Sequence, residues 1–293
     1  MALPSSGQIT LNQVNVELGL SATAQIGLGD SNVRALFNVS SGQIKMSDGY
    51  GKSSETVISS SVQEMTVSNY ISSGGTLRIS SGVYIWSDNV ATAGMIIDIP
   101  CTIINQGYIM GRGGNGGHSY NSGQSGGDAI SVTSTGVTIT NSSGAYIAGG
   151  GGGGAGSAGA SWRAGGGGGA GGGNGGNGTS SSGATGGAIG QNGNSTPGTF
   201  GGPAGGGAST SYDYDRGPAW GGAGGGRVLP GNTNAGTNGS FIAGSVRAAG
   251  SGGGWAAVGG QGGGGDGSGG SGGSAISGTA RTLNNSGTIY GST

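Results

Sequence analysis

The chain carries very little charge. Of its 293 residues, 7% are charged, and the formal net charge is −1. Lysine occurs at only two positions, Lys45 and Lys52. Because nucleic-acid binding needs clustered Lys and Arg against the phosphates, this composition argues against a nucleic-acid partner.

Reactive side chains are equally scarce. Cys101 is the single cysteine and His118 the single histidine. One cysteine excludes an intrachain disulfide framework. A lone histidine leaves no Ser-His-Asp set to assemble, and His, Cys and carboxylates do not cluster as metal ligands would. We therefore predict a protein that is not an enzyme and that holds no metal and no cofactor.

Long apolar runs and targeting signals are also missing. The longest apolar stretch, residues 95–104, is too short and too interrupted to span a membrane. The N-terminal MALPSSGQIT lacks the charged and apolar regions of a signal peptide. We expect a protein that is made in a cytoplasm and is not embedded in a membrane.

Glycine, in contrast, is in large excess. The chain has 80 glycines, of which eleven lie in the first 100 residues, so that roughly one residue in three is glycine thereafter. Six prolines and an irregular spacing argue against a collagen triple helix. Runs such as GGNGGNG (172–178) and GSGGSGGS (267–274) have a local period of three, typical of extended helices with three residues per turn.

Glycine-rich helices of this kind can pack closely and bond laterally through their backbones, which would satisfy the peptide groups. A flexible Gly/Ser linker is the alternative. Bulky side chains recur between the glycine runs, however, among them Trp162, Trp220 and Trp255. A linker rarely contains such residues, so the sequence favours ordered packing.

Residues 1–53 are predicted to form a small attachment domain. LNQVNVELG indicates a helix that Gly19 ends, LGDSNVRALFNV indicates a second helix capped by Asp30 or Ser31, and SGQIKMSDGYGKSS indicates a short strand and a turn. About fifty residues is near the lower limit for independent stability. Its expected core is Ile9, Leu11, Val14, Val16, Leu18, Leu28, Val33, Leu36, Phe37, Ile44 and Met46.

Residues 54–148 alternate between apolar and polar residues, as short β-strands do. TIINQGYIMG (102–111), TITNSSGAYIAG (138–149) and TLNNSGTIYG (282–291) repeat one pattern. The C-terminus therefore returns to the structural unit formed around residues 126–147, in a coil like a β-helix or a sandwich.

The predicted fold is accordingly mostly β and irregular. It has an attachment domain (1–53), a β-rich connecting domain (54–110), a glycine-rich domain of packed polyglycine type II helices joined by loops (111–275), and a C-terminal β repeat (276–293) that packs back on the β region.

The glycine runs, together with the Ile/Asn/Gly repeats, resemble the glycine-rich distal tip adhesins of T4-like bacteriophage long tail fibres. The segments ITLNQVNVELGL, IGLGDSNVRALFNV and IKMSDGYGKS also resemble the N-termini of other tailed-phage tail proteins. The resemblance implies a virion protein at the tail or tail-fibre tip, docked to another tail protein through residues 1–53. It also implies that loops between the helices contact a bacterial outer-membrane protein or surface glycan.

The candidate receptor-binding residues are aromatic, charged or both, as at interface hot spots. Segment 208–220 offers the densest set, and segments 115–124, 157–164 and 230–260 offer others. Packing against glycine helices is the alternative role for each aromatic residue. The candidates are Tyr212, Asp213, Tyr214, Asp215, Arg216, Trp220, Trp162, Arg163, His118, Tyr120 and Trp255.

Two other functions stay open at this stage. A structural tail protein without a receptor role would use its aromatic residues as core. A tail-associated glycan hydrolase would need two facing carboxylates, and Asp213 and Asp215 stand too close in sequence to face each other across a sugar.

Overall fold

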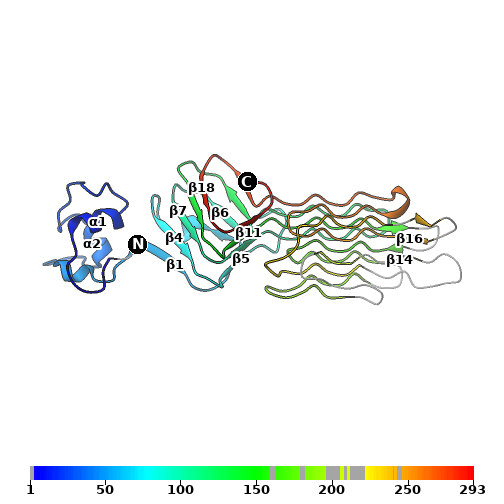
Figure 1. The fold of residues 1–293 in the computed structure, drawn as a ribbon, viewed down its shortest axis with the longest axis horizontal. Helices are drawn as coiled ribbons and strands as arrows, with labels where there is room; N and C mark the ends of the chain where they lie inside the picture. Colours follow the sequence, from blue (N-terminus) through cyan, green and yellow to red (C-terminus); the bar gives the residue numbers. More distant parts are fainter. Residues whose placement is uncertain are drawn as a thin grey trace.

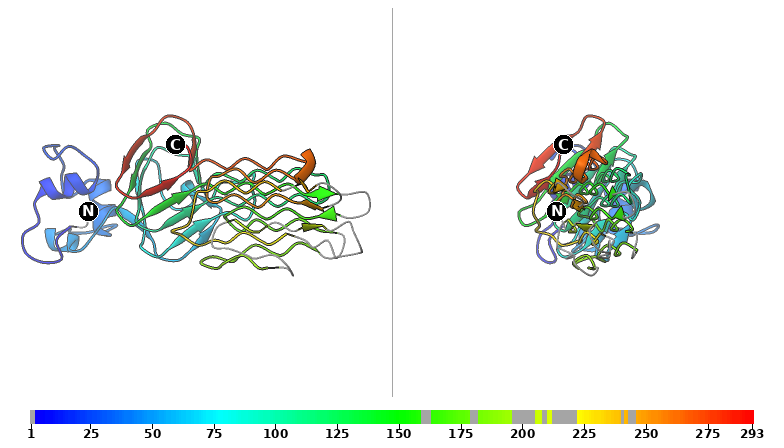
Figure 2. Two further views of the ribbon diagram at one scale, coloured as in Figure 1. Left: turned by 45° about the vertical axis from the view of Figure 1, so that its right-hand side comes forward. Right: turned by 90° about the vertical axis from the view of Figure 1, so that its right-hand side faces the viewer.

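In the computed structural model, the molecule is elongated, with a helical head at one end and long glycine-rich strands at the other (Figure 1). A β region lies between them and carries the C-terminus (Figure 2). The structure describes residues 3–158, 163–178, 182–195, 205–207, 210–211, 222–239, 241–242 and 246–293.

The head contains two helices and a 3-10 turn, α1 (Leu11–Glu17), α2 (Ser31–Phe37) and η1 (Met46–Gly49). Thr10 caps α1 through a capping box with Gln13, and Gly19 follows the helix with a φ of 72°. Its buried core is Leu3, Ile9, Val14, Val33, Leu36 and Phe37.

Three details of the head differ from the sequence prediction. Leu11 and Val16 are exposed, with 42% and 57% of their surface accessible. Leu11 is the first residue of α1, and Val16 follows the buried Val14 by two residues, which places it on the opposite side of the helix. The prediction of a short strand within residues 41–54 is wrong. The backbone N–H of Lys45 donates to the carboxylate of Asp48, and this contact stabilises η1 instead.

The β region is a three-sided coil of short parallel strands. Each full coil places one strand in each of three sheets, whose strand orders are β1-β4-β7-β10-β18, β19-β11-β8-β5-β2 and β17-β9-β6-β3. The strands are β1 (Glu55–Ile58), β2 (Val62–Gln63), β3 (Met65–Thr66), β4 (Thr76–Ile79), β5 (Tyr84–Trp86), β6 (Met95–Ile97), β7 (Thr102–Asn105), β8 (Tyr108–Met110), β9 (Ile130–Val132), β10 (Thr138–Asn141), β11 (Tyr146–Ala148), β17 (Ile276–Gly278), β18 (Thr282–Asn285) and β19 (Thr288–Tyr290), with the 3-10 turn η2 (Val67–Asn69) after β3.

The predicted repeat sets the register of this coil. Thr102 pairs with Thr138, and Thr138 pairs with Thr282, so equivalent residues stack on one another. Inside the coil, Asn105 donates its side-chain amide to Asn141 at 2.9 Å, and Asn141 donates to Asn285 at 2.9 Å. The C-terminal repeat therefore lies against the β region, where β18 pairs with β10 and β19 pairs with β11.

The glycine-rich domain is inserted into the coil at one corner. The chain leaves after β8 and returns at β9, and in the next coil it leaves after β11 and returns at β17. Residues 130–148, which the sequence-based boundaries place inside the glycine-rich domain, thus belong to the coil. The sequence hides this boundary, because the first inserted segment, residues 111–129, is short and is followed directly by coil strands.

The glycine segments are packed extended helices. Gly262 has φ −72° and ψ 149°, the values of a left-handed helix with three residues per turn. Gly166, Gly167 and Gly168 donate their N–H groups in turn to the carbonyls of Gly117, Gly250 and Ala223, at 2.9–3.0 Å. Three successive N–H groups therefore reach three different neighbouring segments, as a period of three requires.

Their carbonyls accept from three further segments, through the N–H groups of Gly176, Gly154 and Gly206. A Cβ on any of residues 165–169 would overlap a neighbouring backbone carbonyl oxygen. This close approach explains the glycine content, and it confirms ordered packing over the linker alternative in the described segments.

Candidate functional site

The end of the glycine-rich domain farthest from the head is a layer of turns and short antiparallel strands (Figure 1). It includes β14 (Thr210–Ser211), β15 (Phe241–Ile242) and β16 (Val246–Ala248), which form one sheet. It also includes the hairpin of β12 (Ser157–Ala158) and β13 (Arg163–Ala164), and the turn η3 (Gly263–Gly265). We call this layer the distal end.

The turn at residues 118–122 belongs to the distal end. The carbonyl of Asn121 accepts from the N–H of Gly156, which directly precedes β12. His118 and Asn121 face each other across the turn, with His118 Nε2 and Asn121 Nδ2 3.4 Å apart. Tyr120 is 55% exposed at this turn, so the structure presents its ring to solvent.

Arg163 lies on the same layer. It pairs with Ala158 in the β12–β13 hairpin and is exposed. Asp266, which follows η3, accepts a hydrogen bond from the Ser157 hydroxyl at 3.0 Å. This contact joins the hairpin to η3, and the glycine-rich sequence around Asp266 carried no signal that predicted it.

The densest set of candidates falls outside the described residues. Trp162, Tyr212, Asp213, Tyr214, Asp215, Arg216 and Trp220 all lie there. The described residues on either side, however, belong to the distal end: β12 and β13 flank residues 159–162, and β14 precedes residues 212–221. Recognition by these residues stays a prediction, and glycan cleavage by Asp213 and Asp215 stays the less favoured alternative.

Trp255 is placed elsewhere, so the structure assigns it the packing role. Its side chain is fully buried, and its Nε1 donates to the carbonyl of Val228 at 3.0 Å. It lies where the glycine-rich domain rests on the coil, in a cluster with Met110, Ala148, Ala170 and Leu229. We leave Trp255 out of the candidate surface.

Aromatic side chains of the coil form the base for this joint. Tyr84 stacks on Tyr108 with ring centroids 4.7 Å apart, and Tyr108 stacks on Tyr146 at 5.7 Å. They pack against the cluster around Trp255. Such stacked pairs contribute about 1 kcal/mol each beyond the area they bury.

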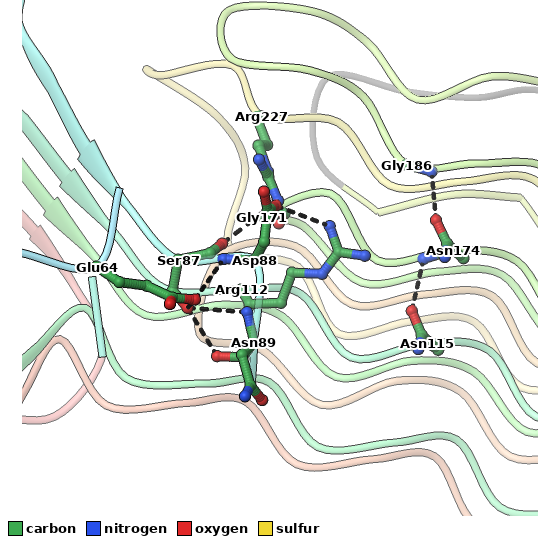
Figure 3. Close-up of polar contacts among 10 residues, drawn as sticks. All are labelled: Glu64, Ser87, Asp88, Asn89, Arg112, Asn115, Gly171, Asn174, Gly186 and Arg227. Atoms are coloured by element: carbon green, nitrogen blue, oxygen red, sulfur yellow. Dashed lines mark hydrogen bonds and ion pairs between the residues drawn. The ribbon is translucent and has the colours of Figure 1, made fainter. Parts of the chain in front are cut away.

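A charged contact also holds the joint (Figure 3). Arg227, from the glycine-rich domain, is 5% exposed at its side chain and donates to Asp88 and to the carbonyl of Gly171. Burial pushes the pKa of Asp88 upward, but the hydrogen bond and charge of Arg227, with the charge of Arg112, outweigh it and lower that pKa. We call Arg227 and Asp88 the joint pair. It ties segment 222–228 of the glycine-rich domain to the loop that follows β5.

Polar side chains close the outer edges of the glycine packing. The Asn115 side-chain oxygen accepts from the N–H of Asn174 at 2.9 Å, and that of Asn174 accepts from the N–H of Gly186 at 2.8 Å (Figure 3). Each oxygen takes the place of a carbonyl that a further helix would supply. Each follows two glycines, Asn115 in GGNGGH (113–118) and Asn174 in GGNGGNG (172–178), and this spacing is the signal that could have predicted them.

Metal and membrane sites find no support in the part of the chain that the structure describes. Among those residues, no three His, Cys, Asp or Glu side chains gather as a metal ion would need. No described helix has the length and apolar character that a bilayer span requires.

Comparison with known proteins gives one family. The model of the phage tail fibre adhesin family Gp38 matches residues 54–293. A solved structure, the gp37-gp38 adhesin tip complex of the bacteriophage S16 long tail fiber, is 22% identical with a TM-score of 0.48, over 89% of this chain and 91% of that chain. Among curated proteins, none matches.

Proposed function

Since the chain belongs to the phage tail fibre adhesin family Gp38, a family of virion receptor-binding proteins, we propose that its distal end contacts the receptor on the bacterial surface. One observation carries this proposal. Described residues flanking the aromatic segments, in β12, β13 and β14, share one end of the molecule, opposite the head (Figure 1). Exposed Tyr120 and Arg163 lie on the same end.

The physical logic is a rigid scaffold that displays side chains. Backbone hydrogen bonds around residues 165–170 hold the helices without any side chain. The segments at their ends can then vary without disturbing a core. Tyr, Trp and Arg are suited to recognition because they offer large contact areas at a low entropy cost. The proposed receptor is an outer-membrane protein or a surface glycan, bound without chemical change.

We further propose that the head docks to another tail or tail-fibre protein. The family match begins at residue 54, so the head of residues 1–53 is a separate module. Its surface exposes Leu11, Val16 and Leu20, and a groove of about 490 Å³ lies beside α1. Exposed apolar side chains beside a groove are typical of protein interfaces.

Binding of the purified chain to intact cells of candidate hosts tests the distal end. The variant Tyr212→Ala, Tyr214→Ala, Arg216→Ala, Trp220→Ala should lose binding while circular dichroism shows an unchanged fold. The matched control is Tyr70→Ala, since Tyr70 is 39% exposed on the coil, away from the distal end. Equal loss of binding in the control, or unchanged binding in the quadruple variant, would contradict the proposal.

A second arm identifies the receptor class. Cells treated with protease should lose binding if the receptor is a protein, and cells treated with periodate should lose it if the receptor is a glycan. The head is tested separately, because Leu11→Ser, Val16→Ser, Leu20→Ser should keep cell binding but no longer copurify with tail fibres.

A further inference from the structure

Five asparagines in the glycine-rich domain are followed directly by glycine: Asn115, Asn174, Asn177, Asn192 and Asn238. An Asn-Gly pair can deamidate without an enzyme, because glycine has no side chain to hinder its backbone nitrogen. That nitrogen attacks the Asn Cγ and forms a new N–Cγ bond, while the Cγ–Nδ2 bond breaks and ammonia leaves with the proton of the glycine N–H. Water then opens the cyclic imide to aspartate or isoaspartate.

In three of the five pairs, hydrogen bonds restrain both reacting groups, the glycine N–H and the asparagine side chain. The N–H of Gly116 donates to Asn174 at 2.8 Å, that of Gly175 to Ala184 at 2.8 Å, and that of Gly239 to Gln261 at 2.7 Å. The side-chain oxygens of the preceding asparagines also accept backbone N–H groups, from Asn174, Gly186 and Gln261 respectively. Attack requires both bonds to break, together with rotation away from the extended helix.

Asn177 is held at one group. Its side-chain oxygen accepts from the N–H of Gly183 at 2.9 Å. The side chain is therefore restrained although it is exposed.

Asn192 differs from the other four. It is exposed, and in the described part of the chain neither its side chain nor the N–H of Gly193 makes a hydrogen bond. It lies on an outer segment, 191–195, that continues the glycine packing on its surface. We propose that Asn192 is a spontaneous deamidation site, and that the glycine-helix packing protects the equivalent pairs.

The position gives the modification a structural consequence. The carbonyl of Gln191 accepts from the backbone N–H of Arg227 at 2.9 Å, and that of Asn194 accepts from the backbone N–H of Gly224 at 3.0 Å. These two contacts are three residues apart, one helical turn, and both reach the segment 222–228. Isoaspartate adds one atom to the backbone between them, so both bonds no longer fit at once. The Arg227 side chain also belongs to the joint pair, so isoaspartate at residue 192 would also disturb the contact between the glycine-rich domain and the coil.

Ageing of the full-length protein at mildly alkaline pH tests the site. Peptide mapping by mass spectrometry should find deamidation at Asn192 about tenfold or more faster than at Asn115, Asn174 and Asn238, since each held pair must first break its bonds. Isoaspartyl methyltransferase labelling should mark the same peptide. In concentrated urea, all five sites should react at similar rates, because the protection comes from the fold.

Asn192→Gln is the control variant. It removes the reactive pair, and among the described residues the side chain it replaces has no hydrogen-bond partner to lose. Its labelling should therefore fall to the background of the held pairs. Asn192→Asp adds the charge without the extra backbone atom, and its thermal unfolding should match that of the fresh wild type while the aged protein unfolds earlier. The proposal is overturned if the folded protein deamidates at Asn115 or Asn174 as fast as at Asn192.

Discussion

The coil and the glycine-rich domain are both built from extended segments that lie side by side, but they are held together by different groups. In the coil, Leu77 pairs with Ile103 and Ile103 pairs with Ile139, and all three side chains are fully buried. In the glycine-rich domain, segment 165–170 is buried among neighbouring backbones and carries no side chain larger than a methyl group.

This difference implies opposite responses to mutation. The coil depends on the volume of the side chains that fill it, so a removed group leaves a cavity. The glycine-rich domain depends on backbones that touch, so an added group has no place to go. One molecule can therefore be used to compare a side-chain core with a backbone core.

The largest effect is expected from adding one methyl group to the backbone core. In Gly168→Ala the new Cβ would overlap the carbonyl oxygen of Gly173. Because that carbonyl belongs to a packed helix, we expect a loss of more than about 4 kcal/mol in the free energy of unfolding.

Thermal unfolding and protease resistance of the domain measure the effect. The matched control is Gly29→Ala in the head, where the added Cβ meets open space and the change should stay within about 0.5 kcal/mol. If Gly168→Ala were as stable as this control, the glycine-rich domain would not depend on close backbone contact.

A smaller loss is expected from removing volume in the coil. Ile139→Ala deletes a fully buried side chain, which costs about 3 kcal/mol in the free energy of unfolding. Val57→Ala, at a position that is 51% exposed on the same sheet, should cost less than about 0.5 kcal/mol. Denaturant titration compares them, and similar midpoints for the two variants would show that the coil does not depend on its interior side chains.

The smallest effect concerns the joint between the two regions. Arg227→Met removes the donor to Asp88 and to two backbone carbonyls, and we expect a loss of about 1–2 kcal/mol in the free energy of unfolding. Asp88→Asn should cost less, because the Asp88 side chain is 48% exposed and solvent screens its charge.

The same pair has a defined pH dependence. Folding lowers the pKa of Asp88. The joint pair therefore contributes fully to the free energy of unfolding above the ordinary carboxyl pKa range, and this contribution is lost as the pH falls below about 4. Stability measured from neutral pH into acid should therefore fall more steeply for the wild type than for Asp88→Asn. Parallel curves would show that the pair adds nothing to the joint.

Local sequence patterns predicted the elements that depend on local chemistry. LNQVNVELG forms the first helix, which ends before Gly19, and the Thr and Asn of each β repeat stack in register. The period of three in the glycine runs predicted packed helices, because only an extended three-residue turn brings successive N–H groups to different neighbours.

Patterns failed where a residue's position depends on distant partners. Val16 looked like core but is exposed, and Trp255 looked like a displayed side chain but is buried beside Leu229. Residues 130–148 showed the β pattern, yet the predicted boundaries of the glycine-rich domain enclosed them, and the structure places them in the coil. In each case the neighbour that decides the outcome lies far away in sequence.

The amino-acid sequence by itself determined the two periods of this protein, two residues in the coil and three in the glycine helices, because each follows from the local backbone and its side chains. Only the tertiary structure decided that the glycine-rich domain is inserted at one corner of the coil and that Arg227 contacts Asp88 across their joint. It also decided which turns and short strands lie together at the distal end. Glycine runs have no side chains that could specify which segments lie beside them, so the lateral order of the helices is set only when the backbones pack.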